Sequence, residues 1–226
     1  MKLLAFRIGF TNVYLLQEGK RCMITDTGSR GHAEKIVKAI TARGLKIENV
    51  SCIFLTHSHF DHAGSAAELQ TITRAKVIIH HLEAGHLARG FTPIPKGTNA
   101  LFRFISKMGK SPNIEKKIGS YKPLKADIII DGEISLAPFG FDVTIMPTPG
   151  HTSGSCSLVG DRFALIGDTM FNFSGKYYPV FANDETALRE SWSKLLKLDV
   201  DWFYPAHGKR IRKDKLLSEA KRIGIL

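Results

Sequence analysis

The sequence predicts an α/β (α+β) fold, and three observations support this prediction. In the first half of the 226-residue chain, apolar strand patterns alternate with amphipathic helix patterns. The second half is richer in strand patterns. A chain of this length, with 43% hydrophobic and 23% charged residues, is within the range of one globular domain with a substantial core. We therefore expect a single domain over residues 1–226.

Apolar and β-branched runs closed by turn residues predict the strands of the first half. These strands are expected at residues 2–8, 12–18, 22–25, 50–56 and 76–80. Residues 32–42 predict a helix, because Ile36, Val37 and Ile40 recur at the spacing of one helical face. Gly44 follows as a stop signal. A second helix is expected to begin near Gly64.

The same criteria predict the strands of the second half. They are expected at residues 127–130, 133–136, 141–147, 155–160, 162–167 and 202–204. Residues 185–198 predict a helix with Leu188, Trp192 and Leu195 on one face. A basic terminal helix follows, with Leu216 and Ala220 directed inward.

Residues 85–125 differ from the rest of the chain. They contain four prolines, several glycines and a helix-like apolar patch at Leu101, Phe102, Ile105 and Met108. A long irregular segment inside a compact domain is usually functional or disordered. We expect a lid-like insertion over a site or a contact in a homodimer, and the sequence leaves both open.

The net charge of +11 arises largely from two basic clusters. Between Lys96 and Lys125 there are eight lysines or arginines and one acid, and between Lys209 and Arg222 there are seven and two. Such clusters attract anionic substrates or nucleic acid, although a solvated surface has the same composition. Charge alone does not identify a partner.

Cysteine usage and the chain start indicate a cytoplasmic protein. Cys22, Cys52 and Cys156 each lie in an apolar, strand-like stretch, which is typical of reduced buried thiols rather than of a disulfide framework. The first residues lack the apolar centre of a signal peptide, and no apolar run is long enough to span a bilayer. We expect no membrane partner.

The segment His57-Ser58-His59-Phe60-Asp61-His62 carries the strongest chemical signal. A chance match to H-x-H-x-D-H is expected in on the order of one in a thousand chains of this composition. Imidazole and carboxylate are the ligand types that zinc prefers in hydrolytic sites. His57 and His59, two residues apart, are suited to one ion. Asp61 and His62, beyond a turn, are suited to a second.

Those four residues cannot complete two metal sites, so further ligands must come from downstream. Three candidates each follow a predicted strand and lie beside Gly or Pro turn residues: His151, Asp168 and His207.

In this order the motifs resemble those of the metallo-β-lactamase superfamily, over nearly the whole chain. The resemblance implies a four-layer αββα sandwich with two metal ions at one edge. It also implies that the first metal is held by His57, His59 and His151. The second metal would be held by Asp61, His62 and His207, with Asp168 bridging both.

Two ligand positions distinguish this chain from other branches of the superfamily and narrow the expected activity. True class B β-lactamases mostly carry a cysteine where this chain has Asp168, and flavo-diiron relatives carry a glutamate where it has His59. We expect a hydrolase of the glyoxalase II-like or lactonase-like branch. The all-histidine pattern favours two zinc ions, with iron or manganese left open.

Asp26, in the turn Asp26-Thr27-Gly28, resembles a family position whose aspartate supports a ligand histidine. The remaining histidines match no ligand position and are expected to be surface or core polar groups: His32, His80, His81 and His86.

The expected reaction is hydrolysis by a metal-bridging hydroxide, which attacks an electrophilic carbonyl while the metals stabilise the oxyanion. Asp61 is the candidate catalytic residue that orients the hydroxide. The segment Gly175-Lys176-Tyr177-Tyr178 is similar to glyoxalase II. This similarity implies that Lys176 binds a carboxylate of the thiol carrier and that Tyr178 offers a hydrogen bond.

Three substrate hypotheses remain. The first is a thioester of an anionic carrier such as coenzyme A or glutathione. The second is a lactone or other carboxylic ester, with Phe91, Phe102 and Ile105 forming an acyl pocket. The third is a phosphodiester, as in a ribonuclease, but the basic clusters lack the interleaved aromatic residues on which single strands stack. We therefore expect a small anionic or acyl-bearing substrate and no nucleic-acid partner.

Overall fold

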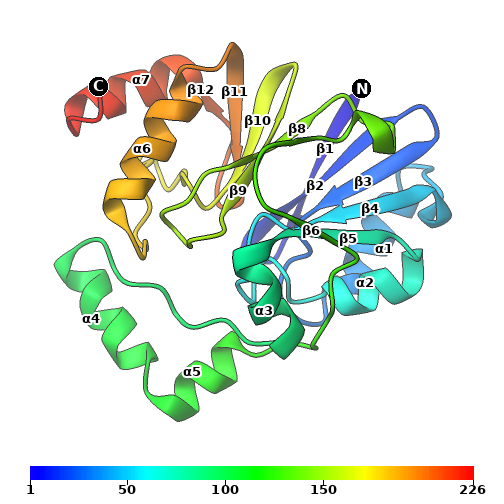
Figure 1. The fold of residues 1–226 in the computed structure, drawn as a ribbon, viewed down its shortest axis with the longest axis horizontal. Helices are drawn as coiled ribbons and strands as arrows, with labels where there is room; N and C mark the ends of the chain where they lie inside the picture. The colour runs from blue at the N-terminus through cyan, green and yellow to red at the C-terminus, as the bar shows by residue number, and fades with distance from the viewer.

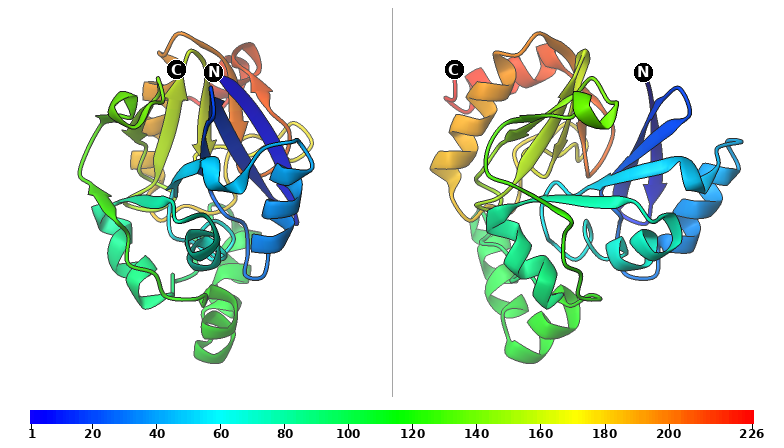
Figure 2. Two further views of the ribbon diagram at one scale, coloured as in Figure 1. Left: turned by 90° about the vertical axis from the view of Figure 1, so that its right-hand side faces the viewer. Right: turned by 45° about the vertical axis from the view of Figure 1, so that its right-hand side comes forward.

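The computed structural model describes residues 1–226 and contains two six-stranded sheets packed face to face, with helices on both outer sides. Figure 1 shows this layering, and Figure 2 shows the sheets from two further sides. The four-layer αββα sandwich expected from the resemblance is thereby confirmed.

The first sheet has the strand order β1-β2-β3-β4-β5-β6. Its strands are β1 (Lys2–Ile8), β2 (Thr11–Glu18), β3 (Arg21–Thr25), β4 (Val50–Phe54), β5 (Lys76–His80) and β6 (Ile128–Ile130). β1, β2 and β3 are antiparallel, whereas the pairs from β3 to β6 are parallel. Its outer face is covered by α1 (Ala33–Thr41), α2 (Ala66–Thr73) and α3 (His81–Arg89).

The second sheet has the order β12-β11-β10-β9-β8-β7. Its strands are β7 (Ile134–Ser135), β8 (Thr144–Pro147), β9 (Cys156–Gly160), β10 (Arg162–Gly167), β11 (Val200–Pro205) and β12 (Ile211–Arg212). Only β10 and β11 are parallel. Its outer face is covered by α6 (Glu185–Leu196) and α7 (Lys213–Arg222), and short 3₁₀ turns lie at Ile47–Asn49 and Ala137–Phe139.

Alternation along the strands distributes the apolar side chains over three layers of core. On β4, Ile53 faces the helices of the first sheet, while Cys52 and Phe54 face the second sheet. This is the period of two that a strand imposes on its side chains. A third layer, around Trp192 and Phe203, fills the space between the second sheet and its helices.

Residues 92–120, here called the arm, extend from one end of the sandwich (Figures 1 and 2). The arm contains α4 (Ala100–Gly109) and α5 (Pro112–Gly119), and an antiparallel bridge between Phe91 and Ser120 closes its base. A second bridge, between Gly97 and Phe181, ties it to the loop before α6. The sequence predicted that residues 85–125 would be irregular apart from one helix-like patch. The segment instead contains the end of α3 and the whole of α4 and α5.

None of the helices is both long and apolar enough to cross a membrane.

Candidate metal centre and substrate cleft

The candidate site lies where several strands end at the same edge of the two sheets. Asp26 follows β3, and the His57–His62 segment follows β4. His151, Asp168 and His207 follow β8, β10 and β11 respectively. Gly167 allows close approach of the two sheets here, because its φ is +48° and an added Cβ would lie 2.8 Å from Thr56 Oγ1.

Three histidines form the first cluster. His57 Nε2 lies 2.9 Å from His59 Nδ1, which lies 2.9 Å from His151 Nε2. All three rings are buried. Their nitrogens therefore converge on one buried point.

The second cluster contains Asp61, His62 and His207, with Asp168 between the two clusters. Asp168 Oδ1 lies 3.3 Å from both His62 Nε2 and His207 Nε2, while its Oδ2 lies 3.4 Å from His151 Nε2. Asp61 Oδ2 is 3.3 Å from His207 Nε2. One carboxylate oxygen of Asp168 thus faces each cluster.

These residues fit two metal ions. His62 Nε2 and Asp168 Oδ1 face the clusters and are buried without a hydrogen-bond partner, although buried polar groups are normally paired. The candidate ligand atoms of each histidine and aspartate group lie within 4.8 Å of one another. Nitrogen and carboxylate donors at this spacing are a ligand set that a divalent metal can satisfy. The clusters are consistent with a dinuclear metal centre.

Three of the ring nitrogens that face away from the clusters are held by other groups. His62 Nδ1 lies 2.9 Å from Asp26 Oδ2, and the Asp26 carboxylate also accepts from Thr56 N and Oγ1. His151 Nδ1 is paired with the carbonyl oxygen of Phe181, and His207 Nδ1 with that of Phe10. Such outer contacts fix the tautomer and orientation of a ligand ring.

Burial and charge set the protonation of the clusters. Burial and the neighbouring His151 lower the pKa of His59 to about 3. Burial also opposes the charge on His207, but Asp168 and Asp61 outweigh it and raise the pKa to about 10. The pKa of Asp61 is raised by burial, yet His62 and His207 more than compensate and lower it to about 2. At neutral pH the Asp61 carboxylate is therefore ionised and His59 is neutral, whereas His207 carries a proton that a bound metal would displace.

Glu83 on α3 is a buried carboxylate that the sequence did not single out. It accepts hydrogen bonds from Ser58 N at 3.0 Å, from the Ser58 hydroxyl and from Gly154 N at 3.2 Å. Burial raises its pKa, but the hydrogen bonds from Ser58 outweigh burial and lower it. Glu83 therefore joins the loop of His57 and His59 to the loop of His151.

A cleft of about 1290 Å³ opens over the clusters, and His59, Asp61, His151, Asp168 and His207 lie among its walls. The arm contributes apolar side chains to it, including Ile94, Phe102, Ile105 and Ile118. Three basic residues also line it: Arg7, Lys209 and Arg210. The cleft thus combines an apolar wall with a cationic region.

Lys176 and Tyr178, expected to bind substrate, do not line this cleft. Lys176 is exposed at the end of a tight turn, where its backbone pairs with that of Phe173. The Tyr178 hydroxyl donates to Glu185 Oε2 at 3.2 Å, and its ring packs against Trp192. Their neighbour Phe173 does reach the cleft.

The other histidines lie outside the two clusters. His80 Nδ1 accepts from Leu82 N and caps α3, and His32 Nδ1 accepts from Ser29 N. His81 pairs with Asp131 at 2.9 Å on the surface, where Asp131 is 84% exposed. None of these histidines contributes a candidate ligand to the two clusters.

Sequence comparison agrees with this geometry. The profile of the metallo-β-lactamase superfamily matches residues 7–207, which include both clusters. The chain belongs to the metallo-β-lactamase superfamily. Within the superfamily it is similar to a protein described as a probable metallo-hydrolase of Bacillus subtilis, at 33% identity over 190 residues. That match covers 83% of this chain and 79% of the relative.

Two further relatives bear on the chemistry. A probable metallo-hydrolase of Methanocaldococcus jannaschii is 26% identical over 202 residues, covering 88% of this chain and 87% of the relative. A hydroxyacylglutathione hydrolase of Erwinia tasmaniensis is 28% identical over 187 residues, which cover 83% of this chain and 57% of that enzyme. The family and the two clusters together therefore indicate a metal-dependent hydrolase.

Solved structures of the superfamily have the same fold. The B3 metallo-β-lactamase BLEG-1 superposes with a TM-score of 0.71 at 23% identity, covering 96% of this chain and 97% of that one. The enzyme BJP-1 of Bradyrhizobium japonicum gives a TM-score of 0.67 at 19% identity, covering 97% and 90%.

Proposed function

We propose that this metallo-hydrolase cleaves a thioester between an acyl group and an anionic thiol carrier. The observation that carries the proposal is the composition of the cleft over the metal clusters. Apolar residues of the arm, such as Phe102 and Ile118, suit an acyl group, and Arg7, Lys209 and Arg210 suit an anionic carrier. A small-molecule substrate that is both acyl-bearing and anionic matches both parts.

Five histidines and two aspartates would hold two metal ions, for which we propose zinc, with iron or manganese as alternatives. Two such ions supply an activated water at neutral pH and positive charge beside the substrate carbonyl. The ligand assignment is the one implied by the superfamily: His57, His59 and His151 for one ion, Asp61, His62 and His207 for the other, and Asp168 for both.

Asp61 is the proposed catalytic residue. Its side chain is 21% exposed, more than that of His207 or Asp168, and it lines the cleft. Because its pKa is lowered to about 2, the carboxylate is ionised and can accept a hydrogen bond from the attacking water. Asp26 supports this arrangement by holding the ring of His62 from behind.

The relatives support a thioester in particular. The enzymes named hydroxyacylglutathione hydrolases act on a thioester of a thiol peptide, and two of them are 28% identical to this chain. The expected roles of Lys176 and Tyr178 derive from the same resemblance. Since neither residue lines the cleft, we assign the contact with the carrier to Lys209 and Arg210 instead.

A lactone is the second candidate, favoured by the apolar share of the cleft. Phe171, Phe173 and Phe181 line it in addition to the arm residues, and these rings suit an acyl chain without any anionic carrier. A phosphodiester has less support, because none of the basic residues of α7 lines the cleft.

Hydrolysis by zinc-loaded protein tests the proposal. Acyl-coenzyme A, lactoylglutathione and an acyl-homoserine lactone are compared, with His59→Ala as the blank. We expect thioester turnover by the parent, none by His59→Ala, and a raised KM in Lys209→Ala/Arg210→Ala. Lys215→Ala on α7 is the matched control, and Lys176→Ala tests the residue expected from the sequence. If only the lactone is hydrolysed, the thioester proposal is wrong and the protein is a lactonase.

A further inference from the structure

The solvent-facing side of α4 is apolar. Leu101 and Phe104 are both 63% exposed, and Met108 is 57% exposed. These residues are spaced so that they share one helical face with Ile105, which is also exposed. A helix on the surface of a globular protein normally buries such a face against the core. In α4 it has no partner within the chain.

α5 extends this apolar surface. Ile114 and Ile118 lie four residues apart and are both exposed. The arm therefore carries six of the thirteen large apolar side chains that are exposed in the whole chain. We call these six residues the arm patch: Leu101, Phe104, Ile105, Met108, Ile114 and Ile118. Apolar side chains gathered in this way mark an interaction surface.

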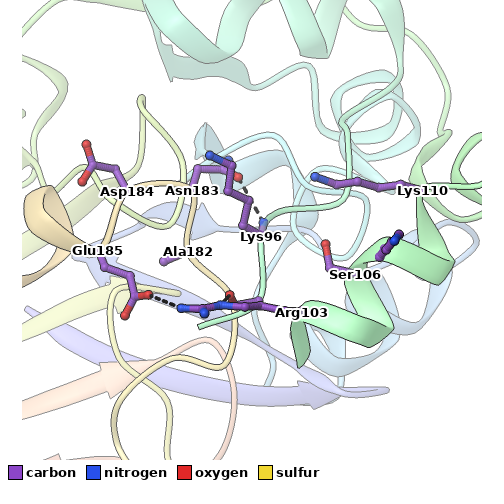
Figure 3. Close-up of a pocket in the computed structure, with 10 residues that line it drawn as sticks. Lys96, Arg103, Ser106, Lys110, Ala182, Asn183, Asp184 and Glu185 are labelled. Carbon is purple, nitrogen blue, oxygen red and sulfur yellow. Dashed lines mark hydrogen bonds and ion pairs between the residues drawn. The ribbon is translucent and has the colours of Figure 1, made fainter. Parts of the chain in front are cut away.

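The arm that carries this patch is basic. The arm contains six lysines or arginines and one acid, Glu115. The Glu115 carboxylate is used internally, because it accepts from Ile94 N at 3.0 Å. Figure 3 shows Lys96, Arg103 and Lys110 around a hollow of about 620 Å³ on the other side of α4, where only Arg103 approaches an acid, Glu185, at 3.7 Å.

We infer that the arm patch docks onto the surface of an anionic phospholipid bilayer. A helix with exposed apolar residues on one face and lysines on the other is suited to lie in the headgroup region, where the apolar face is buried and the lysines meet anionic lipid. A second copy of this chain is a poorer partner, since a symmetric contact would bring together two arms that each carry six cations and one acid. The sequence alone predicted no membrane partner, and this inference revises that prediction.

The position of the arm patch connects it to the cleft. Ile105 and Ile118 belong to the patch and also line the cleft over the metal clusters. A docked arm would therefore place the apolar wall of the cleft beside the bilayer, where acyl-bearing substrates partition. This binding is independent of which bond the enzyme cleaves.

Cosedimentation of the zinc-loaded protein with vesicles tests the inference without measuring turnover. Vesicles of phosphatidylcholine with about 30 mol% phosphatidylserine are compared with pure phosphatidylcholine. We expect binding to the anionic vesicles that weakens as salt rises from about 0.1 M to about 1 M. Leu101→Ser/Phe104→Ser/Met108→Ser should reduce the partition coefficient about tenfold or more. Ile72→Ser/Ile129→Ser, which changes exposed apolar residues outside the arm, should leave it unchanged.

Charge is tested separately. Lys107→Glu/Lys110→Glu should remove the preference for anionic vesicles, whereas Lys215→Glu/Lys221→Glu on α7 should retain it. Thermal unfolding checks that each variant is folded. A single Phe104→Cys variant carrying an environment-sensitive dye gives a second readout, a blue shift on anionic vesicles.

Three results would overturn the inference. One is failure of the parent to bind anionic vesicles. Another is equal binding by the parent and the arm variants. The third is a parent dimer that ignores vesicles and dissociates in the Phe104→Ser variant, which would make the arm patch a self-association surface.

Discussion

At the scale of single residues, the metal centre depends on Asp26, a side chain behind the clusters. Asp26 has a φ of +60°, which asparagine tolerates, so Asp26→Asn keeps the turn and changes only the carboxylate. Without the carboxylate, the ring of His62 loses the acceptor 2.9 Å from its Nδ1. We expect zinc affinity to fall about 10- to 100-fold, measured by competition with a chromogenic chelator.

The matched control is Asp127→Asn. Asp127 also accepts hydrogen bonds, from Val77 N and Gln70, but lies far from the clusters in the fold. It should leave zinc affinity unchanged. Unchanged affinity in Asp26→Asn as well would show that His62 does not need the carboxylate.

Glu83→Ala should destabilise the fold itself. It leaves three buried donors, from Ser58 and Gly154, without their acceptor. Each such donor costs about 1–3 kcal/mol, so the free energy of unfolding should fall by about 3 kcal/mol or more in urea titrations of the zinc-free protein. Glu34→Ala, in the first turn of α1, should change it by less than about 0.5 kcal/mol. Similar values for both variants would contradict the role given to Glu83.

The cysteines should be inert in the native protein. Burial raises the pKa of the Cys156 thiol to about 12 and also raises the pKa values of Cys22 and Cys52. Because the thiolate is the reactive form, a disulfide reagent at about pH 8 should label the three thiols only after denaturation. Rapid labelling of the folded protein would disprove this and would reopen Cys156 as a functional residue.

The spacing of His57, His59, Asp61 and His62 made these residues recognisable, because the signal is local. Glu83 was missed because its partners are remote: Ser58 is 25 residues away and Gly154 is 71. Nothing in the sequence around Glu83 distinguishes it from an exposed helix residue. Its role depends on the packing of α3 against two loops.

At the scale of elements, α4 depends on its own capping, because one of its faces lacks a partner in the chain. Asn99 caps it, and its Oδ1 accepts from Phe102 N at 3.1 Å. Asn99→Ala should cost about 1 kcal/mol, which is about a fivefold loss of protection of the α4 amides in hydrogen exchange. The cap of α6, Asp184, serves as the control, since Asp184→Ala should affect α6 and spare α4. Loss of protection in α4 from both variants, or from neither, would contradict independent capping.

All strands except β12, and the helices α1, α2, α6 and α7, were predicted from sequence patterns, with ends that differ by a few residues, whereas α3 was not predicted. The strand expected at residues 50–56 ends at Phe54, since the chain turns there toward the metal clusters. α5 was not predicted, because its apolar residues Ile114 and Ile118 face solvent and give no core-facing pattern. Its start follows the signal of Ser111 and Pro112.

At the scale of the whole molecule, the four-layer sandwich followed from the family resemblance and not from the strand patterns. Periodicity places strands along the chain but does not order them, and the neighbours β10 and β11 are separated by α6. The two clusters form only when the ends of four strands meet: β4, β8, β10 and β11. This is why the remote ligands were expectations from the resemblance, while the chemistry of the His57–His62 segment was apparent by itself.

The central claim is that these histidines and aspartates hold two metal ions in one centre. The most direct test is the number of zinc ions per chain, counted by native mass spectrometry after loading and desalting. The parent should hold two, His59→Ala should hold fewer, and His86→Ala, a histidine outside the clusters, should again hold two. A loaded parent with one zinc ion or none, or a His59→Ala variant that retains two, would contradict the account.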